Sequence, residues 1–288
     1  MLIGRTDCLL LNSSSFVINS YIVFHLNTPQ INRIMSTKFF LFTCFFISFI
    51  EMNAQQKAKP EDTEVYSPVP KTVDPGKPGC TAPSDAIVLF DGTNLNQWVS
   101  GKDTTQPAGW TLQNGLLKVN KQAGDIQTRQ NFLDYQLHLE WRVPENITGS
   151  GQARGNSGIF LASVFDGGYE LQILDSYNNS TYVNGQAGSM YKQYIPLVNP
   201  MRPQGEWQVY DVIWTAPRFK ADGSLLSPAR VTAFLNGVLV QNNVALKGRT
   251  EYIGQPKYDA HGPAPIKLQA HGDPSEPISF RNIWVRNL

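Results

Sequence analysis

Apolar and polar residues alternate one by one through many short segments of this 288-residue chain, and residues typical of tight turns separate the segments. The clearest alternation is in residues 135–143, where Leu137 and Leu139 fall on the same side of an extended strand. Asn114-Gly115 and Asn236-Gly237 interrupt two further runs. Asn-Gly is the strongest short signal of a β-hairpin, because both residues accept positive φ angles. The period of two predicts antiparallel strands that bury one face.

At least nine strand candidates follow Ala86, and no segment beyond it carries a sustained helical stripe. Residues 85–288 are long enough to bury a substantial core as a single domain. The pattern predicts an all-β domain, an antiparallel two-sheet β-sandwich of the jelly-roll type. Five aliphatic residues of the most regular strands are expected in its core: Leu137, Leu139, Leu171, Ile173 and Leu268.

A segment typical of a secretory signal peptide covers residues 35–54. Met35 opens a short basic start, an apolar run of twelve residues follows, and Ala54 supplies the small residue at the cleavage site. Twelve residues are too few to span a bilayer, which needs about 20. We therefore expect a mature chain that begins near Gln55, without stable membrane insertion. The expected location is periplasmic, secreted or at the cell surface.

Residues 1–34 precede this segment without a clear pattern, and we interpret them as an upstream extension from a mis-assigned start, with Met35 as the true initiator. A membrane anchor in residues 16–24 is the rival interpretation. That run is short, and Asn19 and Ser20 interrupt it.

Residues 55–84 are rich in proline, which predicts an extended linker or strap between the signal peptide and the domain. Cys80 is the one cysteine that remains after removal of the signal peptide, so no intramolecular disulfide is expected. The formal net charge is +1, and Lys and Arg are scattered along the chain. A nucleic-acid partner would require a concentrated basic face, so none is expected.

Several predicted strands carry chemically active groups on the side opposite their apolar residues. Glycines around Asn156 and Ser157 leave room for a ligand to approach the backbone. A solvated outer face explains any single strand of this kind. Several such strands together predict a groove that can hydrogen-bond the many hydroxyls of a sugar. The sets that share a side are His138, Glu140 and Arg142, then Glu170 and Gln172, then Lys267, Gln269 and His271.

Eleven segments spread over residues 86–288 occur in an order that resembles a known family. Among them are VLFDGTNLNQW, YQLHLEWRV, GNSGIFL, YELQILD, GQAGSMY and FRNIWVRNL. The succession is similar to the 3-keto-disaccharide hydrolase family, a branch of the concanavalin A-like lectin/glucanase superfamily. The resemblance implies a concanavalin A-like fold, a carbohydrate substrate, and an exported enzyme of glycan degradation.

The glucanases of the same superfamily provide a contrast, because they carry Glu-x-Asp-x-(x)-Glu on one strand. Here Glu170-Leu-Gln172-Ile-Leu-Asp175 has Gln at the middle position and Asp at the last. A retaining glycosidase needs two carboxyl groups about 5–5.5 Å apart. Glu170 and Asp175 are five positions apart, so they point to opposite faces of a regular strand unless a bulge intervenes. This pattern disfavours direct double displacement.

A 3-keto sugar, which the resemblance implies as the substrate, allows another route. Its C3 carbonyl acidifies the hydrogen on C2, a base removes that hydrogen, and the C1 substituent leaves by elimination. Addition of water then gives net hydrolysis. The candidate acids and bases are Glu170, Glu140 and His271. The candidate substrate-binding residues are Asn156, Gln172, Asp175, Tyr191, Gln269 and Arg281, of which Asn156, Gln172 and Arg281 are candidate stabilisers of the enolate oxygen.

The sequence leaves alternatives open. A divalent metal is a candidate cofactor, since Glu140, Glu170 and His271 could form a carboxylate–histidine site after folding. Asp175 has a second interpretation as the cap of the turn that follows it. A non-catalytic, lectin-like carbohydrate-binding module and a glucanase-type glycoside hydrolase are the alternatives to cleavage of 3-keto-glycosides. Several carboxylates and a histidine on one groove favour an enzyme over a lectin.

Overall fold

The computed structural model describes residues 58–77 and 81–288. The predicted upstream extension, the signal peptide, the mature start near Gln55, and Cys80 lie outside the described residues. The chain divides into two compact units between Val69 and Pro70. The described part of the first unit contains the 3-10 helix η1 (Pro60–Thr63) and exposed chain. No helix in the described ranges is long and apolar enough to cross a membrane.

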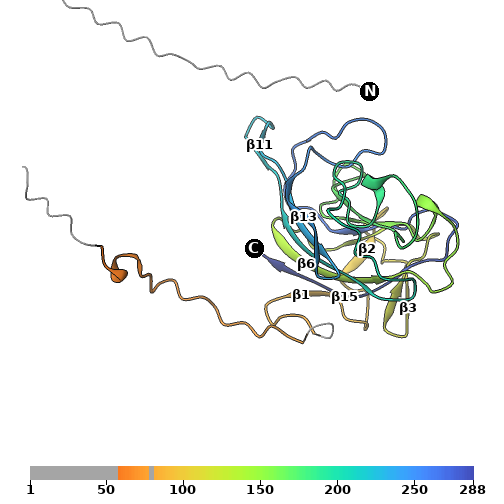
Figure 1. The fold of residues 1–288 in the computed structure, drawn as a ribbon, viewed down its shortest axis with the longest axis horizontal. Coiled ribbons are helices and arrows are strands. Elements are labelled where there is room, and N and C mark those ends of the chain that lie inside the picture. Colours follow the sequence, from red (N-terminus) through yellow and green to blue (C-terminus); the bar gives the residue numbers. More distant parts are fainter. Residues whose placement is uncertain (1–57, 78–80) are drawn as a thin grey trace, which may run out of the picture. The chain divides into compact units, whose positions relative to one another are not determined.

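The second unit is built on a large antiparallel sheet of eight strands (Figure 1). Its main path runs β13-β12-β9-β6-β15-β4-β3, and β1 pairs with β15. The strands are β1 (Ile87–Phe90), β3 (Thr111–Gln113), β4 (Leu116–Lys118), β6 (Tyr135–Arg142), β9 (Gln208–Thr215), β12 (Arg230–Leu235), β13 (Val238–Ala245) and β15 (Ser279–Asn287).

A second antiparallel sheet has five strands in the order β2-β5-β14-β7-β8. They are β2 (Trp98–Ser100), β5 (Ile126–Thr128), β7 (Ser157–Phe160), β8 (Glu170–Ile173) and β14 (Lys267–Leu268). A separate hairpin joins β10 (Arg218–Phe219) and β11 (Leu225–Ser227), and two short 3-10 helices, η2 (Gly151–Ala153) and η3 (Val183–Gly185), lie in the loops. The predicted all-β, antiparallel two-sheet sandwich is confirmed.

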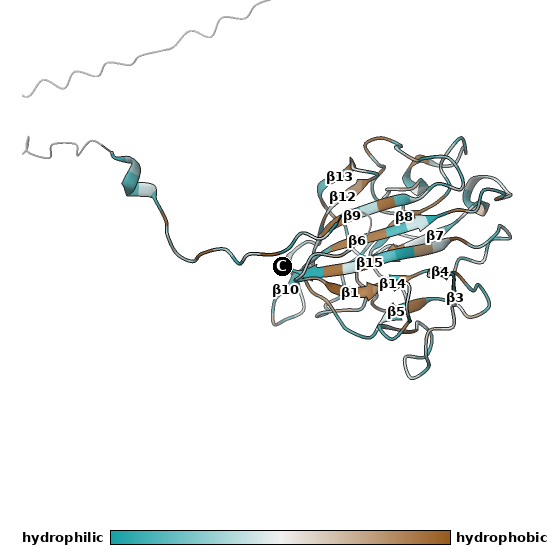
Figure 2. Cartoon of the chain, turned by 90° about the horizontal axis from the view of Figure 1, so that it is seen from below, coloured by the Kyte–Doolittle hydropathy of each residue, from teal (hydrophilic) through white to brown (hydrophobic). Residues whose placement is uncertain are grey.

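The alternation along the strands decides which side chains enter the core between the sheets. Figure 2 shows hydrophobic and hydrophilic residues alternating along β6, β9 and β15. The five residues predicted for the core, Leu137, Leu139, Leu171, Ile173 and Leu268, are all fully buried. The predicted hairpins also form, because Asn114-Gly115 joins β3 to β4 and Asn236-Gly237 joins β12 to β13, with φ between 52° and 79° at all four residues.

Two buried tyrosines of the large sheet fix the position of the small sheet. Tyr135 donates its hydroxyl hydrogen to the Leu161 carbonyl at 2.5 Å, just beyond β7. Tyr210 donates to the Gln172 carbonyl of β8 at 2.7 Å. Because a buried hydroxyl needs a partner, these bonds select one alignment of the two sheets. They hold β7 and β8, whose outer faces carry the polar residues described below.

We expect Leu137→Ala to lower the free energy of unfolding by about 2–5 kcal/mol, because it opens a cavity in the core. Ile213 on the neighbouring strand β9 is 46% exposed and serves as the matched control. Ile213→Ala should cost no more than about 1 kcal/mol. Urea unfolding followed by circular dichroism measures both variants, and equal losses would contradict the assignment of faces.

Candidate functional site

A groove of about 400 Å³ opens on the face of the small sheet that points away from the core. Strands β7, β8 and β14 and their continuations form its floor, and loops around residues 191 and 251 form its rim. The residues that line it are Asn156, Phe160, Glu170, Gln172, Tyr191, Thr250, Tyr252, Gln269 and His271. Six of the nine residues predicted for the site thus meet in one cavity: Glu170, His271, Asn156, Gln172, Tyr191 and Gln269.

The register of β7 and β8 places Glu170 at the centre of this floor. Phe160 pairs with Glu170, and Gly158 pairs with Gln172, so all four positions share the outer face. A Cβ atom at Gly158 would overlap the Glu170 carboxylate. The carboxylate therefore lies over Gly158, in space that any other residue would fill.

Two loop segments cover the carboxylate. Tyr191 donates its backbone N–H to the Glu170 carbonyl at 3.0 Å, while Met190 forms a bridge with Leu171. Thr250 accepts the Glu170 backbone N–H through its hydroxyl, also at 3.0 Å. Glu170 is only 5% exposed as a result.

Burial raises the pKa of Glu170 to about 8, although the positive charge of Lys267 opposes the shift. Asp125 adds a smaller contribution in the same direction as burial. Lys267 is itself buried, with its Nζ 3.5 Å from an Asp125 carboxylate oxygen and 4.1 Å from the centroid of the Phe160 ring. A carboxyl group with a pKa near neutrality can exchange a proton with a bound ligand at physiological pH.

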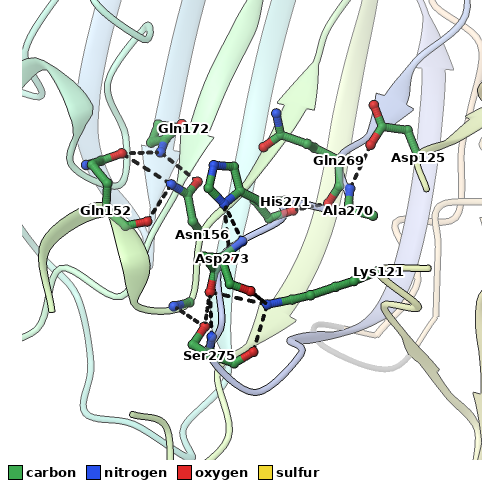
Figure 3. Close-up of polar contacts among 12 residues, drawn as sticks. Lys121, Asp125, Gln152, Asn156, Gln172, Gln269, Ala270, His271, Asp273 and Ser275 are labelled. Atoms are coloured by element: carbon green, nitrogen blue, oxygen red, sulfur yellow. Dashed lines mark hydrogen bonds and ion pairs between the residues drawn. The ribbon is translucent and has the colours of Figure 1, made fainter. Parts of the chain in front are cut away.

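A chain of amides lines one end of the groove (Figure 3). Gln172 Nε2 donates to Asn156 Oδ1 at 3.1 Å, and Asn156 Nδ2 donates to the Gln152 carbonyl at 2.8 Å. Gln172 Oε1 and Gln269 Oε1 are buried without a hydrogen-bond partner. An unsatisfied buried acceptor is unusual in a folded protein, and here both acceptors belong to residues that line the same groove. The amide groups of Gln172 and Gln269, as part of the groove lining, are of a type that hydrogen-bonds sugar hydroxyls.

The imidazole of His271 is held from below by Asp273 (Figure 3). Its Nδ1 lies 3.1 Å from Asp273 Oδ2. Burial alone would raise the pKa of Asp273, but hydrogen bonds from His271 and Ser275 outweigh this effect and hold the pKa at about 2. Lys121 lies 3.2 Å from the other oxygen of the same carboxylate. The Asp273 backbone N–H also lies 3.2 Å from Nδ1 and donates to it, so Asp273 occupies this nitrogen and Nε2 is the ring nitrogen left for a ligand.

Tyrosines and a lysine form the rim. Tyr191 and Tyr182 share a hydrogen bond of 2.5 Å between their hydroxyl groups. Burial and this hydrogen bond raise the pKa of Tyr191 above its usual value, so the phenol stays protonated at neutral pH. Lys192 Nζ lies 4.0 Å from the Tyr252 ring centroid and donates to the Tyr252 carbonyl at 2.7 Å.

Glu140 and Arg281 do not belong to this groove, and their predicted place in it is wrong. Both lie in the large sheet, where Glu140 on β6 pairs with Arg281 on β15. Arg281 Nε lies 2.6 Å from a Glu140 oxygen, and Asn282 donates to the other oxygen at 2.9 Å. The side chains share a face, as alternation requires, but alternation does not say which sheet a strand joins.

Asp175 is also outside the groove. It is fully buried beyond the end of β8, where Arg154 Nε lies 2.8 Å from its carboxylate and Gln204 donates to it at 2.8 Å. Its other oxygen accepts the Tyr177 backbone N–H, so the interpretation as a turn cap describes it correctly. Strand β8 ends at Ile173, so strand parity does not extend to Asp175.

The metal hypothesis that combined Glu140, Glu170 and His271 fails for the same reason, because Glu140 lies in the other sheet. Within residues 58–77 and 81–288, no group of three or more His, Cys, Asp or Glu side chains is arranged to hold a metal ion.

The sequence pattern assigns no role to Phe160, Thr250 and Tyr252, and it predicts for Lys267 only a place on the groove side of its strand. Lys267 had a usable signal, because it shares a strand side with Gln269 and His271. Thr250 and Tyr252 had none, since they reach the groove from a loop about 80 positions away from Glu170 in the sequence.

The chain is similar to several known proteins. The model of the 3-keto-alpha-glucoside-1,2-lyase-like domain family matches residues 85–286. The curated 3-keto-disaccharide hydrolase of Bacteroides thetaiotaomicron is 28% identical over 152 residues, which are 42% of this chain and 49% of that protein. The chain thus spans about half the length of this curated relative.

Two solved structures from Parabacteroides distasonis, both named as candidate glycosyl hydrolases, are similar to this chain. One is 57% identical with a TM-score of 0.76, covering 80% of this chain and 97% of that chain. The other is 20% identical with a TM-score of 0.50. It covers 70% of this chain and 94% of that chain, and it supports the fold alone.

Glu140→Gln should separate a structural carboxylate from a catalytic one. Burial would raise the Glu140 pKa, but hydrogen bonds from His138, Asn282 and Arg281 hold it at about 2. Loss of this charge should lower the free energy of unfolding at pH 7 by about 1–3 kcal/mol. At temperatures below the melting temperature of the variant, its kcat should stay within about twofold of the kcat of the unmodified protein. A loss of kcat without a loss of stability would return Glu140 to the active site.

Glu170→Gln should change how stability depends on pH. The folded-state pKa of Glu170, about 8, exceeds the ordinary value of 4.5, so the folded protein holds this proton more tightly than the unfolded chain. Its ionisation therefore costs stability increasingly between pH 4.5 and 8. The variant should match the unmodified protein near pH 4 and exceed it by a few kcal/mol near pH 9. Denaturant titrations at several pH values measure the free energy of unfolding of both proteins. If the two plots of this free energy against pH run parallel, the prediction of a raised Glu170 pKa is wrong.

Proposed function

The chain belongs to the family of 3-keto-alpha-glucoside-1,2-lyase-like domains, and from this premise we propose that it cleaves the glycosidic bond of 3-keto-disaccharides by elimination. The enzyme acts as a lyase if the reaction stops at the elimination product. It acts as a net hydrolase if water then adds to that product. The carbohydrate substrate binds in the groove over β7, β8 and β14.

One observation carries the proposal: Glu170 is the only carboxylate among the residues described as lining the groove. Double displacement on an ordinary glycoside needs a second carboxylate about 5–5.5 Å away. Asp175, the nearest candidate in the sequence, is engaged by Arg154 and Gln204. A single base is sufficient for elimination from a sugar whose C3 ketone already activates the C2 hydrogen.

In the proposed reaction, the Glu170 carboxylate removes the proton from C2. The electron pair of the C2–H bond forms a C2–C3 double bond, and negative charge develops on the ketone oxygen. Lys267 and the amide of Gln269 lie beside Glu170 on the same sheet face and are suited to stabilise this oxygen. The enolate then expels the C1 oxygen, and the leaving alcohol takes a proton.

Two groups can supply that proton. His271 offers Nε2 while its Nδ1 is held by Asp273. Tyr191 offers a phenol that burial and Tyr182 keep protonated. The pKa of Glu170, near 8, suits a base that must take a weakly acidic C–H proton and then return it to water.

Glu170→Gln keeps the size and shape of the side chain and removes the base. We expect kcat on a 3-keto-disaccharide to fall by roughly 10²–10⁴, the usual contribution of general acid–base catalysis. Gln172→Ala should raise KM at least as much as it lowers kcat, because an amide that binds hydroxyls stabilises ground and transition states alike. Release of free sugar measures both variants.

The unoxidised parent disaccharide is the matched substrate control, since its C2 hydrogen is not acidic. It should bind weakly and remain intact. Equal cleavage of both sugars would support a glucanase-type hydrolase instead. Binding of both sugars without cleavage of either would support a lectin-like module.

We also propose that the enzyme works outside the cytoplasm, on the evidence of the basic start, apolar run and small residue in residues 35–54. N-terminal sequencing of the protein recovered from a bacterial periplasm or medium should give a chain that starts near Gln55. Retention of residues 35–54 on the recovered protein would contradict this.

A further inference from the structure

A second cavity, of about 380 Å³, lies beside the groove on the same sheet. Its floor is formed by β5 and β14, and its far side by the turn that follows β7. The residues that line it are Gly101, Lys102, Asp125, Gln127, Ser163, Val164, Phe165, Asp166 and Lys267. The mechanism above uses only Lys267 of this set.

Lys267 and Phe160 mark the boundary between the two cavities. Phe160 lines the first cavity, Lys267 lines the second, and the two residues pair directly across β7 and β14. On the other side, Lys267 pairs with Gln127 of β5. The two cavities are therefore consecutive stretches of one sheet surface, with the Glu170 carboxylate in the first.

The turn at the edge of the second cavity has an unusual conformation. Phe165 and Asp166 both have positive φ angles, 52° and 61°, and the Gly167 backbone N–H closes the turn on the Val164 carbonyl at 3.0 Å. Gly, Asn and Asp favour such positions, whereas a bulky aromatic residue is an outlier there. A strained residue of this kind is a reason to look for a function.

This turn holds the Phe165 ring in the open, at the rim of a polar cavity. The ring is 53% exposed, and Arg249 lies 5.5 Å from its centroid. Ser163, just before the turn, donates its N–H to the Pro265 carbonyl at 2.8 Å, which anchors the turn beside β14. An aromatic surface next to amide, carboxylate and ammonium groups matches the two sides of a pyranose, one rich in C–H groups and one rich in hydroxyls.

We propose that this second cavity is the subsite for the leaving-group sugar, and that Phe165 is the platform on which that sugar stacks. Lys102, Gln127 and Asp166 offer hydrogen-bond partners for its hydroxyls. The inference rests on the proposed function, because that function identifies the sugar in the second cavity as the leaving group. The two rings of the 3-keto-disaccharide then occupy the two cavities, with the reacting ring in the first.

The test compares a 3-keto-disaccharide with methyl 3-keto-glucoside, which presents the same reacting ring and no second sugar. Phe165→Asn removes the platform and suits the left-handed backbone, so the turn is preserved. It should lower the ratio of kcat/KM for the disaccharide to kcat/KM for the methyl glycoside by about tenfold. Gln127→Ala, which does not touch the turn, should lower the same ratio by about threefold. Leu226→Asn, at an exposed position of β11, is the matched control and should leave the ratio unchanged.

An unchanged ratio in both Phe165→Asn and Gln127→Ala would overturn the subsite. If the proposed function itself fails, the unmodified protein will convert neither substrate, releasing no sugar from the disaccharide and no methanol from the methyl glycoside. In that case, calorimetric titration with free glucose decides the point. Weaker binding to Phe165→Asn than to Leu226→Asn would support the subsite, and equal or absent binding would overturn it.

Discussion

The two-faced nature of a β-strand is the constraint on which the rest of this structure depends. Leu171 and Ile173 must enter the core, so Glu170 and Gln172 point outward, into the groove. The hydrogen bonds of Tyr135 and Tyr210 to the small sheet fix that sheet on the core. An outward carboxylate would ordinarily be solvated, but here the loops around Tyr191 and Thr250 cover it. Core packing and loop closure together produce a buried, proton-exchanging group.

Glu140 and Glu170 show how the same residue type acquires opposite roles. Both are almost fully buried. Hydrogen bonds from His138, Asn282 and Arg281 outweigh the burial of Glu140, which lowers its pKa to about 2 and leaves it ionised and structural. The Glu170 carboxylate lies above Gly158 and has only the nearby charge of Lys267 to offset its burial, so its pKa rises to about 8. Burial is common to both, and the number of partners separates a structural carboxylate from a chemical one.

The groove combines rigid and adaptable parts in a way that suits a sugar substrate. The base, the lysine and the Gln172 amide stand on paired strands, which hold them in fixed relative positions. The aromatic rim, including Tyr191 and Tyr252, comes from loops. Gln172 and Gln269 line the groove, and each has a buried side-chain oxygen without a hydrogen-bond partner. In the proposed reaction, this arrangement positions the C2 hydrogen of the sugar against one carboxylate. A glycosidase that uses double displacement would instead place the glycosidic bond between two carboxylates.

The sequence by itself determined the sandwich, its hairpins and its core, because alternation and Asn-Gly turns are local properties of the chain. Parity also determined that Glu170 and Gln172 project from the outer side of their strand. Only the tertiary structure decided which sheet each strand joins, and this moved Glu140 and Arg281 away from the groove. It also brought Thr250 and Tyr252 in from a distant loop and ended β8 before Asp175. The physical reason is that parity assigns a side chain to one face of its own strand, whereas neighbouring strands and covering loops are selected by long-range packing and hydrogen bonding.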